Sequence, residues 1–122
     1  MSGKTILVTG ASSGLGRETS LLLSSLGAKL VLIARNEGRL NDTLSQLEGS
    51  GHASRVFDLN QLEAIPDFIK NICEQAVALS GLFHAAGIAP VLSIKAIKEK
   101  SVLAPFQTSI FASLMLAKAF CQ

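Results

Sequence analysis

The residues that most clearly indicate chemistry form a glycine-rich segment near the amino terminus, TGASSGLG, whose glycines are spaced G-x-x-x-G-x-G. The segment directly follows a short apolar stretch, as in a turn that joins a strand to a helix. In such a turn Gly10 permits the sharp bend, Gly14 lets the backbone approach a pyrophosphate, and Gly16 lets the helix pack closely on the sheet. Free N–H groups at the helix start attract the anion, and the hydroxyls of Ser12 and Ser13 are further donors. The segment therefore predicts a phosphate-binding turn.

Two alternatives to this interpretation have less support in the sequence. Glycine-rich turns also connect strands to helices where no ligand binds, but three glycines in this spacing after the first apolar strand favour a ligand. The loop G-x-x-x-x-G-K-[ST], which holds nucleoside triphosphates, is absent from the sequence. We therefore expect a dinucleotide rather than ATP or GTP.

The elements that must position this turn alternate along the chain between apolar runs and helical periods. We expect strands at residues 4–9, 29–34, 53–57 and 79–85, and helices at 14–26, about 40–47, from 66 onward and 101–122, with a short helix or turn at 93–100. This alternation is typical of parallel sheets with right-handed crossovers. The predicted fold class is α/β, a Rossmann-type doubly wound parallel sheet with about four strands, in a single domain over residues 1–122.

Two local patterns define the predicted helix boundaries and faces. Leu15, Leu22, Leu23 and Leu26 fall on one face of the first helix, which is typical of an amphipathic helix packed on a core, and Gly27 ends it. In the third helix, Asn60 with Glu63 resembles a capping box, and Pro66 is expected at the helix start. Four apolar side chains of that helix are then expected to face the sheet: Ile65, Phe68, Ile69 and Ile72.

Together with two later motifs, the glycine spacing resembles the cofactor signature of the short-chain dehydrogenase/reductase family. Asp58-Leu59, after the third strand, looks like the family's adenine-contacting pair. HAAG at residues 84–87 is similar to its N-A/N-A-G element, with His84 in place of the first Asn. The resemblance covers essentially all 122 residues and identifies the chain with the family's amino-terminal, cofactor-binding half.

The resemblance implies a cofactor site made of these motifs and the end of the second strand. Its expected members are Gly10, Ser12, Ser13, Gly14, Leu15, Gly16, Arg35, Asn36, Asp58, Leu59, Ala85, Ala86 and Gly87. Asp58 has a plain alternative as a turn or capping residue. His84 is expected to be a hydrogen-bonded core histidine rather than a catalytic base.

The residue after the second strand indicates which dinucleotide binds. An acidic residue there would accept hydrogen bonds from the ribose 2′-OH of NAD(H). Arg35, followed by Asn36, holds that place, and a guanidinium pairs with a 2′-phosphate through charge-assisted hydrogen bonds. We therefore expect NADP(H) rather than NAD(H). The family resemblance implies a basic residue just before the second glycine in many NADP(H)-binding members; Ser13 holds that place here, so we expect moderate selectivity. Arg35 could instead be a solvated charge, and Arg17 could be either a phosphate-side charge or a surface residue.

The family's catalytic residues are not found in this chain. The resemblance implies a Ser, a Tyr and a Lys in a Y-x-x-x-K arrangement, yet the chain contains no tyrosine. An Asn that often completes the set has Ser109 at its matching place. We expect this chain to be the cofactor-binding portion of an NADP(H)-dependent enzyme that transfers hydride to or from a carbonyl/alcohol substrate, and to be inactive alone. The alternative is a natural short module that binds NADP(H), or dimerises, without catalysis.

Composition limits the remaining possibilities. The net charge of +2 without a basic stripe does not indicate nucleic acid. Cys73 and Cys121 show no metal-ligand spacing, so reduced thiols and no metal site are expected. The first residues do not resemble a signal peptide, which favours a cytoplasmic location.

The last helix and the fourth strand indicate a partner. Residues 101–117 carry no charge, a length at the lower limit for crossing a bilayer, but Pro105 and several polar side chains favour a buried helix over a membrane span. The family places this helix in its main dimer contact, and the fourth strand would expose an open edge. With a mean hydropathy of +0.43, these features predict a homo-oligomer or a complementing carboxyl-terminal half.

Overall fold

A computed structural model describes residues 1–75, 78–87 and 93–120. The chain divides into two compact units. The sheet unit comprises Met1–Asp58 and Ile72–Ala86, and the helical unit comprises Leu59–Asn71 and Gly87–Gln122. The expectation of one domain over residues 1–122 stays a prediction.

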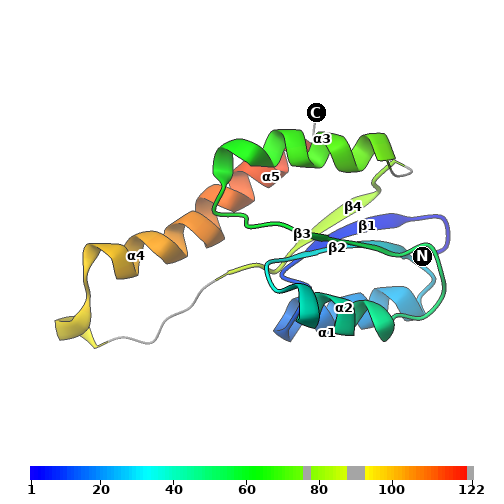
Figure 1. The fold of residues 1–122 in the computed structure, drawn as a ribbon, viewed down its shortest axis with the longest axis horizontal. Coiled ribbons are helices and arrows are strands. Elements are labelled where there is room, and N and C mark those ends of the chain that lie inside the picture. Colours follow the sequence, from blue (N-terminus) through cyan, green and yellow to red (C-terminus); the bar gives the residue numbers. More distant parts are fainter. Residues whose placement is uncertain (76–77, 88–92, 121–122) are drawn as a thin grey trace. The chain divides into compact units, whose positions relative to one another are not determined.

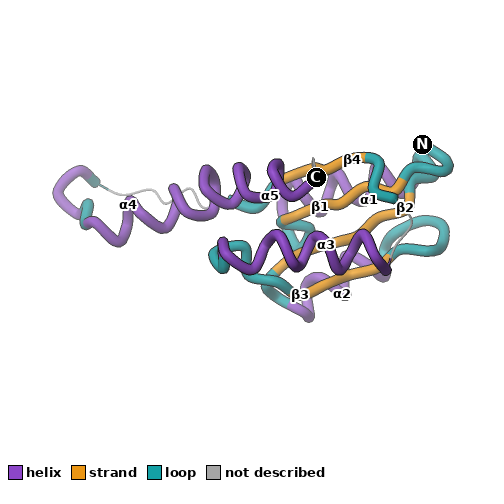
Figure 2. Tube along the Cα trace, turned by 90° about the horizontal axis from the view of Figure 1, so that it is seen from above, coloured by secondary structure: helices purple, strands orange, loops and turns teal. Residues whose placement is uncertain are grey.

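The sheet unit contains four strands, all paired in parallel as the sequence predicts. They are β1 (Thr5–Thr9), β2 (Lys29–Ala34), β3 (Ala53–Val56) and β4 (Gly81–His84). The order across the sheet is β3-β2-β1-β4, as Figure 2 shows. This order matches the first four strands of the doubly wound arrangement 3-2-1-4-5-6. The predicted fold class is therefore confirmed, with β3 and β4 at the two edges.

The two central strands form the core because they are apolar on both faces. Every residue of β1 is buried, and every residue of β2 except Lys29. Helices α1 (Gly14–Ser25) and α2 (Glu37–Ser45) cover one face of the sheet (Figure 1). The cluster between these layers consists of Ile6, Val8, Ala11, Ala28, Leu30, Leu32, Ala34 and Leu40, with Leu23, Leu44 and Leu47 packed against it. Continuous burial of this kind is what parallel strands require.

The predicted apolar face of α1 is wrong. Leu15, Leu22 and Leu26 are 78%, 59% and 52% exposed, whereas the buried positions are Gly16, Ser20 and Ser24. Only Leu23 of the predicted set packs on the core. At Gly16 the reason is steric, because a Cβ there would overlap the backbone of Gly10 in the turn that precedes α1. The polar groups of the buried serines are satisfied, because Ser20 Oγ donates to the Gly16 carbonyl at 2.7 Å.

The helical unit begins with a tighter turn than the sequence predicts. A 3-10 turn spans Leu62–Ala64, and its N-cap is Gln61 rather than the Asn60 of the expected capping box. Instead, Asn60 Oδ1 accepts a hydrogen bond from Thr108 Oγ1 at 2.8 Å, which joins the two segments of this unit.

Helix α3 (Ile65–Gln75) follows this turn with Pro66 as its second residue, close to the predicted start. Its residues up to Asn71 belong to the helical unit and those from Ile72 to the sheet unit. Of the four apolar side chains expected to be buried, Ile65, Ile69 and Ile72 are at most 4% exposed, while Phe68 is half-buried.

The last helical stretch consists of α4 (Glu99–Phe106), a π-helical segment Gln107–Phe111 and α5 (Ala112–Phe120), after a 3-10 turn at Ile94–Ala96. Pro105 lies inside α4 and directly precedes the π segment. Because proline has no N–H to donate and its ring crowds the preceding turn, the regular hydrogen-bond ladder is interrupted there.

This helix is not buried within the chain itself, and its expected burial against a partner stays a prediction. No residue of α4 is buried, and α5 buries only Ala112 and Leu116. Glu99–Phe120 is long and apolar enough to cross a membrane, with a mean hydropathy of 1.3 over a window that is only 17% buried. Length and composition alone support that description, and an exposed protein-binding helix meets the same criteria.

Candidate cofactor-binding site

The glycine-rich turn leaves β1 with Gly10 in the left-handed region, at φ +66°. A Cβ on Gly10 would lie 2.6 Å from the backbone N of Ala86 and 2.8 Å from the carbonyl carbon of Ala85. The next residue, Ala11, donates its N–H to the Ile33 carbonyl at 3.2 Å. The turn is therefore held between the ends of β2 and β4, and only glycine fits at its first position.

Gly16 is the second point of close approach. A Cβ there would overlap the carbonyl oxygen of Gly10 and would lie 3.2 Å from the N of Ala11. Gly16 is also buried on the inner face of α1. The role predicted for it, close packing of the helix, agrees with this geometry, and the element that it contacts is the turn itself.

Gly14 differs from the other two glycines because open space surrounds it. A Cβ there would meet nothing within 4 Å, and its φ is +54°. The preceding Ser13 is the N-cap of α1, and its side chain makes no capping hydrogen bond. The first backbone N–H groups of α1 therefore receive no capping hydrogen bond from Ser13, and the space beside Gly14 is open. This arrangement fits an anionic group at the helix start.

The polar side chains near the site differ from one another in their exposure and their hydrogen bonds. Arg35 is exposed and directly follows the last residue of β2. Asn36 is the N-cap of α2, where its Oδ1 accepts from the Arg39 N–H at 2.9 Å. The Arg17 guanidinium instead donates to Gln46 Oε1 at 2.9 Å. This contact favours a structural role for Arg17, which joins α1 to the end of α2.

The end of β4 contacts the end of β1 through side chains as well as backbone. His84 Nδ1 lies 2.6 Å from Thr9 Oγ1, and the Ala85 N–H donates to the Thr9 carbonyl at 3.2 Å. The expectation of a hydrogen-bonded histidine is confirmed. Because β4 is an edge strand, however, His84 is half-buried rather than fully in the core. Sequence reasoning missed the Thr9 contact, since 75 positions separate the two residues.

The remaining predicted residues border the helical unit. Asp58, half-buried, is the last residue of the first segment of the sheet unit, and Leu59, 5% exposed, begins the helical unit. Gly87 opens the second segment of that unit. A Cβ on Gly87 would lie 3.3 Å from Ser109 Oγ, so the π-helical segment brings Ser109 close to Gly87 within the helical unit. No sequence signal other than the family resemblance points to that pairing.

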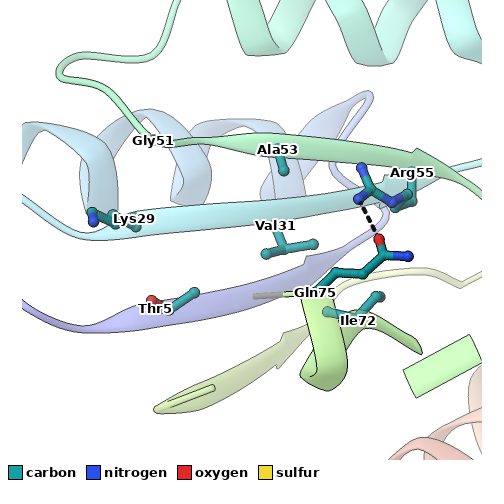
Figure 3. A pocket seen from close by; sticks show the side chains of 8 residues that line it. All are labelled: Thr5, Lys29, Val31, Gly51, Ala53, Arg55, Ile72 and Gln75. Atoms are coloured by element: carbon teal, nitrogen blue, oxygen red, sulfur yellow. Dashed lines mark hydrogen bonds between the residues drawn. The ribbon is translucent and has the colours of Figure 1, made fainter. Parts of the chain in front are cut away.

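A cavity of about 240 Å³ lies elsewhere in the sheet unit (Figure 3). It is lined by Thr5, Lys29, Val31, Gly51, Ala53, Arg55, Ile72 and Gln75. Thr5 and Lys29 are the first residues of their strands, whereas the glycine turn follows the last residue of β1. None of the predicted cofactor residues lines this cavity, and it is therefore distinct from the candidate site. Arg55 in its wall donates to Gln75 Oε1 at 3.1 Å.

Comparison with known proteins identifies the family. The model of the short chain dehydrogenase family matches residues 4–122. This chain belongs to the short-chain dehydrogenase family. The resemblance predicted from the motifs is thereby confirmed over almost the whole sequence, as is its assignment to the amino-terminal half of such proteins.

Individual relatives give the extent of the likeness. An uncharacterised oxidoreductase of Listeria monocytogenes is 37% identical over 79% of this chain and 40% of its own length. An NADP-dependent 3-hydroxy acid dehydrogenase of Schizosaccharomyces pombe is 32% identical over 73% of this chain and 36% of its own. A solved short chain dehydrogenase of Escherichia coli CFT073, complexed with NADPH, matches with a TM-score of 0.90 and 28% identity, over 99% of this chain and 53% of that one. The chain thus spans about half, or less, of the length of these relatives.

Proposed function

We propose that this chain binds NADP(H) through the glycine-rich turn and Arg35, as the cofactor-binding portion of an NADP(H)-dependent short-chain dehydrogenase/reductase. In the complete enzyme the reaction is hydride transfer between NADP(H) and a carbonyl or alcohol substrate. The observation that carries the proposal is the exposed Arg35 directly after β2, in the same unit as the start of α1. That helix start has no side-chain cap, and the space beside Gly14 is open. Solved relatives complexed with NADPH and with NADP support the choice of cofactor.

Different residues of this chain would hold different parts of the cofactor. Backbone N–H groups at the start of α1, with the Ser12 and Ser13 hydroxyls, would hold the pyrophosphate. Arg35 and Asn36 would hold the 2′-phosphate, and Asp58 with Leu59 would contact the adenine. Leu15 and residues 85–87 would complete the walls of the cofactor site. A bound NADPH supplies a hydride, and the chain's own contribution is to bind and orient the dinucleotide.

Arg35 is expected to account for most of the preference for NADPH over NADH. A bidentate guanidinium–phosphate pair is stronger than a neutral hydrogen bond, so replacing Arg35 with alanine should weaken NADPH binding by about 10- to 100-fold. NADH binding should change less than about threefold, because NADH has no 2′-phosphate. Titration of the cofactors into the full chain, followed by calorimetry at low and moderate salt, measures both constants.

Arg55→Ala is the matched control for this titration. Arg55 is also an exposed arginine of the sheet unit, and its contacts are Gln75 and the Ser54 carbonyl. The Arg55→Ala substitution removes the same charge from β3, outside the candidate site, so NADPH binding should be retained. Equal binding of NADPH and NADH by the unaltered chain would contradict the proposed selectivity, and binding of neither would contradict the proposed function.

A second candidate is a short module that binds the dinucleotide without catalysis. The specific observation in its favour is that none of the 122 residues is a tyrosine, so the proton transfer that the family assigns to tyrosine has no donor in this chain. The intact mass of the protein purified from its own source cells separates the two candidates. A mass near twice the calculated 12.8 kDa supports the enzyme, and a mass of 12.8 kDa supports the module.

We further propose that a second polypeptide covers the exposed apolar side chains of the helical stretch Glu99–Phe120, either another copy of the chain or a complementing half. The exposed set is Val102, Leu103, Phe106, Ile110, Phe111 and Leu114. Phe83 on the edge strand β4 is also 37% exposed. Light scattering of the purified chain should give at least twice its monomer mass, and Phe106→Glu should reduce that mass. A monomer at all concentrations would exclude self-association and leave the complementing half.

A further inference from the structure

His84 and Thr9 form a short side-chain contact at the carboxyl edge of the sheet unit. They are the last residues of β4 and β1 and lie opposite each other in the register. The two atoms in contact, His84 Nδ1 and Thr9 Oγ1, are 2.6 Å apart, and Thr9 is fully buried. A histidine stands here in place of the asparagine that the family motif carries.

Thr9 connects this contact to the phosphate-binding turn. Its hydroxyl oxygen also accepts the Ala86 N–H at 3.5 Å, and its carbonyl accepts the Ala85 N–H at 3.2 Å. The next residue along the chain is Gly10, whose backbone packs directly on Ala85 and Ala86. Thr9 and Gly10 therefore contact the same two residues after β4, Ala85 and Ala86.

The hydrogen-bonding capacity of the groups indicates how the bond is arranged. A threonine hydroxyl has one proton to donate and two lone pairs to accept with. If the hydroxyl donates to His84 Nδ1, its oxygen remains available to the Ala86 N–H, and the imidazole proton resides on Nε2. This arrangement satisfies the Thr9 hydroxyl and the Ala86 N–H together. It also restrains a rigid ring that has only two rotatable bonds.

We propose that His84 is a positioning residue for the phosphate-binding turn, and that through Thr9 it sets the affinity of the turn for the pyrophosphate of a dinucleotide. The proposal rests on the proposed function, since it names what controls that same site. It assigns His84 no contact with the cofactor and no role in proton transfer. The imidazole acts by holding Thr9, and Thr9 holds the start of the turn against Ala86.

The test compares three variants of the full chain by fluorescence titration with NADPH, at a temperature where circular dichroism shows each to be folded. His84→Leu removes the bond and should weaken NADPH binding about tenfold. His84→Asn places an amide atom near the position of Nδ1 and should restore affinity to within about twofold. Thr9→Val removes the hydroxyl at similar size and should weaken binding as His84→Leu does. The double variant His84→Leu/Thr9→Val should show no further loss, because both changes break one bond.

Each result has a defined meaning. Unchanged NADPH affinity in His84→Leu would overturn the inference, even if thermal stability falls, since histidine would then be a structural residue only. Equal weakening by His84→Asn and His84→Leu would overturn it as well, because the hydrogen bond would not be the cause. If His84→Leu does not fold, Thr9→Val against Thr9→Ser provides the same comparison. Failure of the unaltered chain to bind NADPH would instead contradict the proposed function.

Discussion

Replacing Gly16 with alanine is expected to destabilise the sheet unit by more than about 3 kcal/mol and to abolish NADP(H) binding. The added methyl group would overlap the carbonyl oxygen of Gly10 and press on the N of Ala11. Both neighbours are backbone atoms in a turn that is fixed at its other side, and they cannot move away as a flexible side chain would. The helix must then separate from the sheet, which removes burial from Ser20 and Leu23.

Gly38→Ala is the control for Gly16→Ala, since both glycines lie in helices. A Cβ on Gly38 would meet only Asn36 Oδ1, at an ordinary contact distance of 3.6 Å. Alanine is favoured over glycine in a helix by up to about 1 kcal/mol, so this variant should be as stable as the unaltered chain or slightly more stable. Chemical denaturation followed by circular dichroism measures both. A Gly16→Ala protein with unaltered stability and NADPH affinity would show that α1 is not held against the turn as the structure describes.

Replacing Gly10 with alanine is expected to cost about 2–4 kcal/mol and to weaken NADPH binding at least tenfold. Two effects add at this position. The φ of +66° is unfavourable for any residue with a Cβ, by roughly 1–2 kcal/mol. The methyl group would also lie 2.6 Å from the Ala86 N and 2.9 Å from the Ala85 carbonyl oxygen, so β1 and β4 would have to separate.

Gly3→Ala separates these two effects. Gly3 also has a positive φ, of +78°, but a Cβ there would meet nothing within 4 Å. This variant should therefore lose only the conformational part of the unfolding free energy, about 1–2 kcal/mol. Under conditions where it is folded, its NADPH affinity should be unchanged. Thermal unfolding and cofactor titration of both variants provide the comparison. If Gly10→Ala costs no more than Gly3→Ala, the close approach to Ala85 and Ala86 has no energetic weight.

The two glycine predictions and the His84 inference concern one continuous set of contacts. Gly16 packs on Gly10, Gly10 packs on Ala85 and Ala86, and His84 holds Thr9 beside the same residues. The turn is therefore positioned by β4 as much as by the helix that follows it. A change at either end of this set is expected to reach the pyrophosphate position through backbone shifts rather than through lost ligand contacts.

Both units have surface that another polypeptide could cover. Within the sheet unit, the order β3-β2-β1-β4 makes β4 an edge strand with one unpaired hydrogen-bonding edge. The helical unit similarly exposes large apolar side chains on α4 and α5. Apolar surface of this extent is typical of protein interfaces, which agrees with the proposal that another polypeptide covers it.

The sequence by itself determined the fold class, the strand positions to within a few residues and the turn that joins β1 to α1. These features depend on local patterns: apolar runs of strand length, glycines at turn spacing and a basic residue directly after β2. Gly27, which ends α1 with φ +86°, was predictable for the same reason. The family followed from the order of the motifs along the chain.

The tertiary structure alone decided which faces are buried and which distant residues meet. Helical periodicity marks leucines as the inner face of α1, but the buried residues are Gly16, Ser20 and Ser24, and at Gly16 the backbone of Gly10 leaves no room for a side chain. Asn60 has the spacing of a cap, yet its Oδ1 accepts from Thr108, 48 positions away. The partner of His84 depends on β1 and β4 being adjacent, an arrangement that only the sheet creates. Such contacts depend on the packing of whole elements, and no local pattern of residues encodes them.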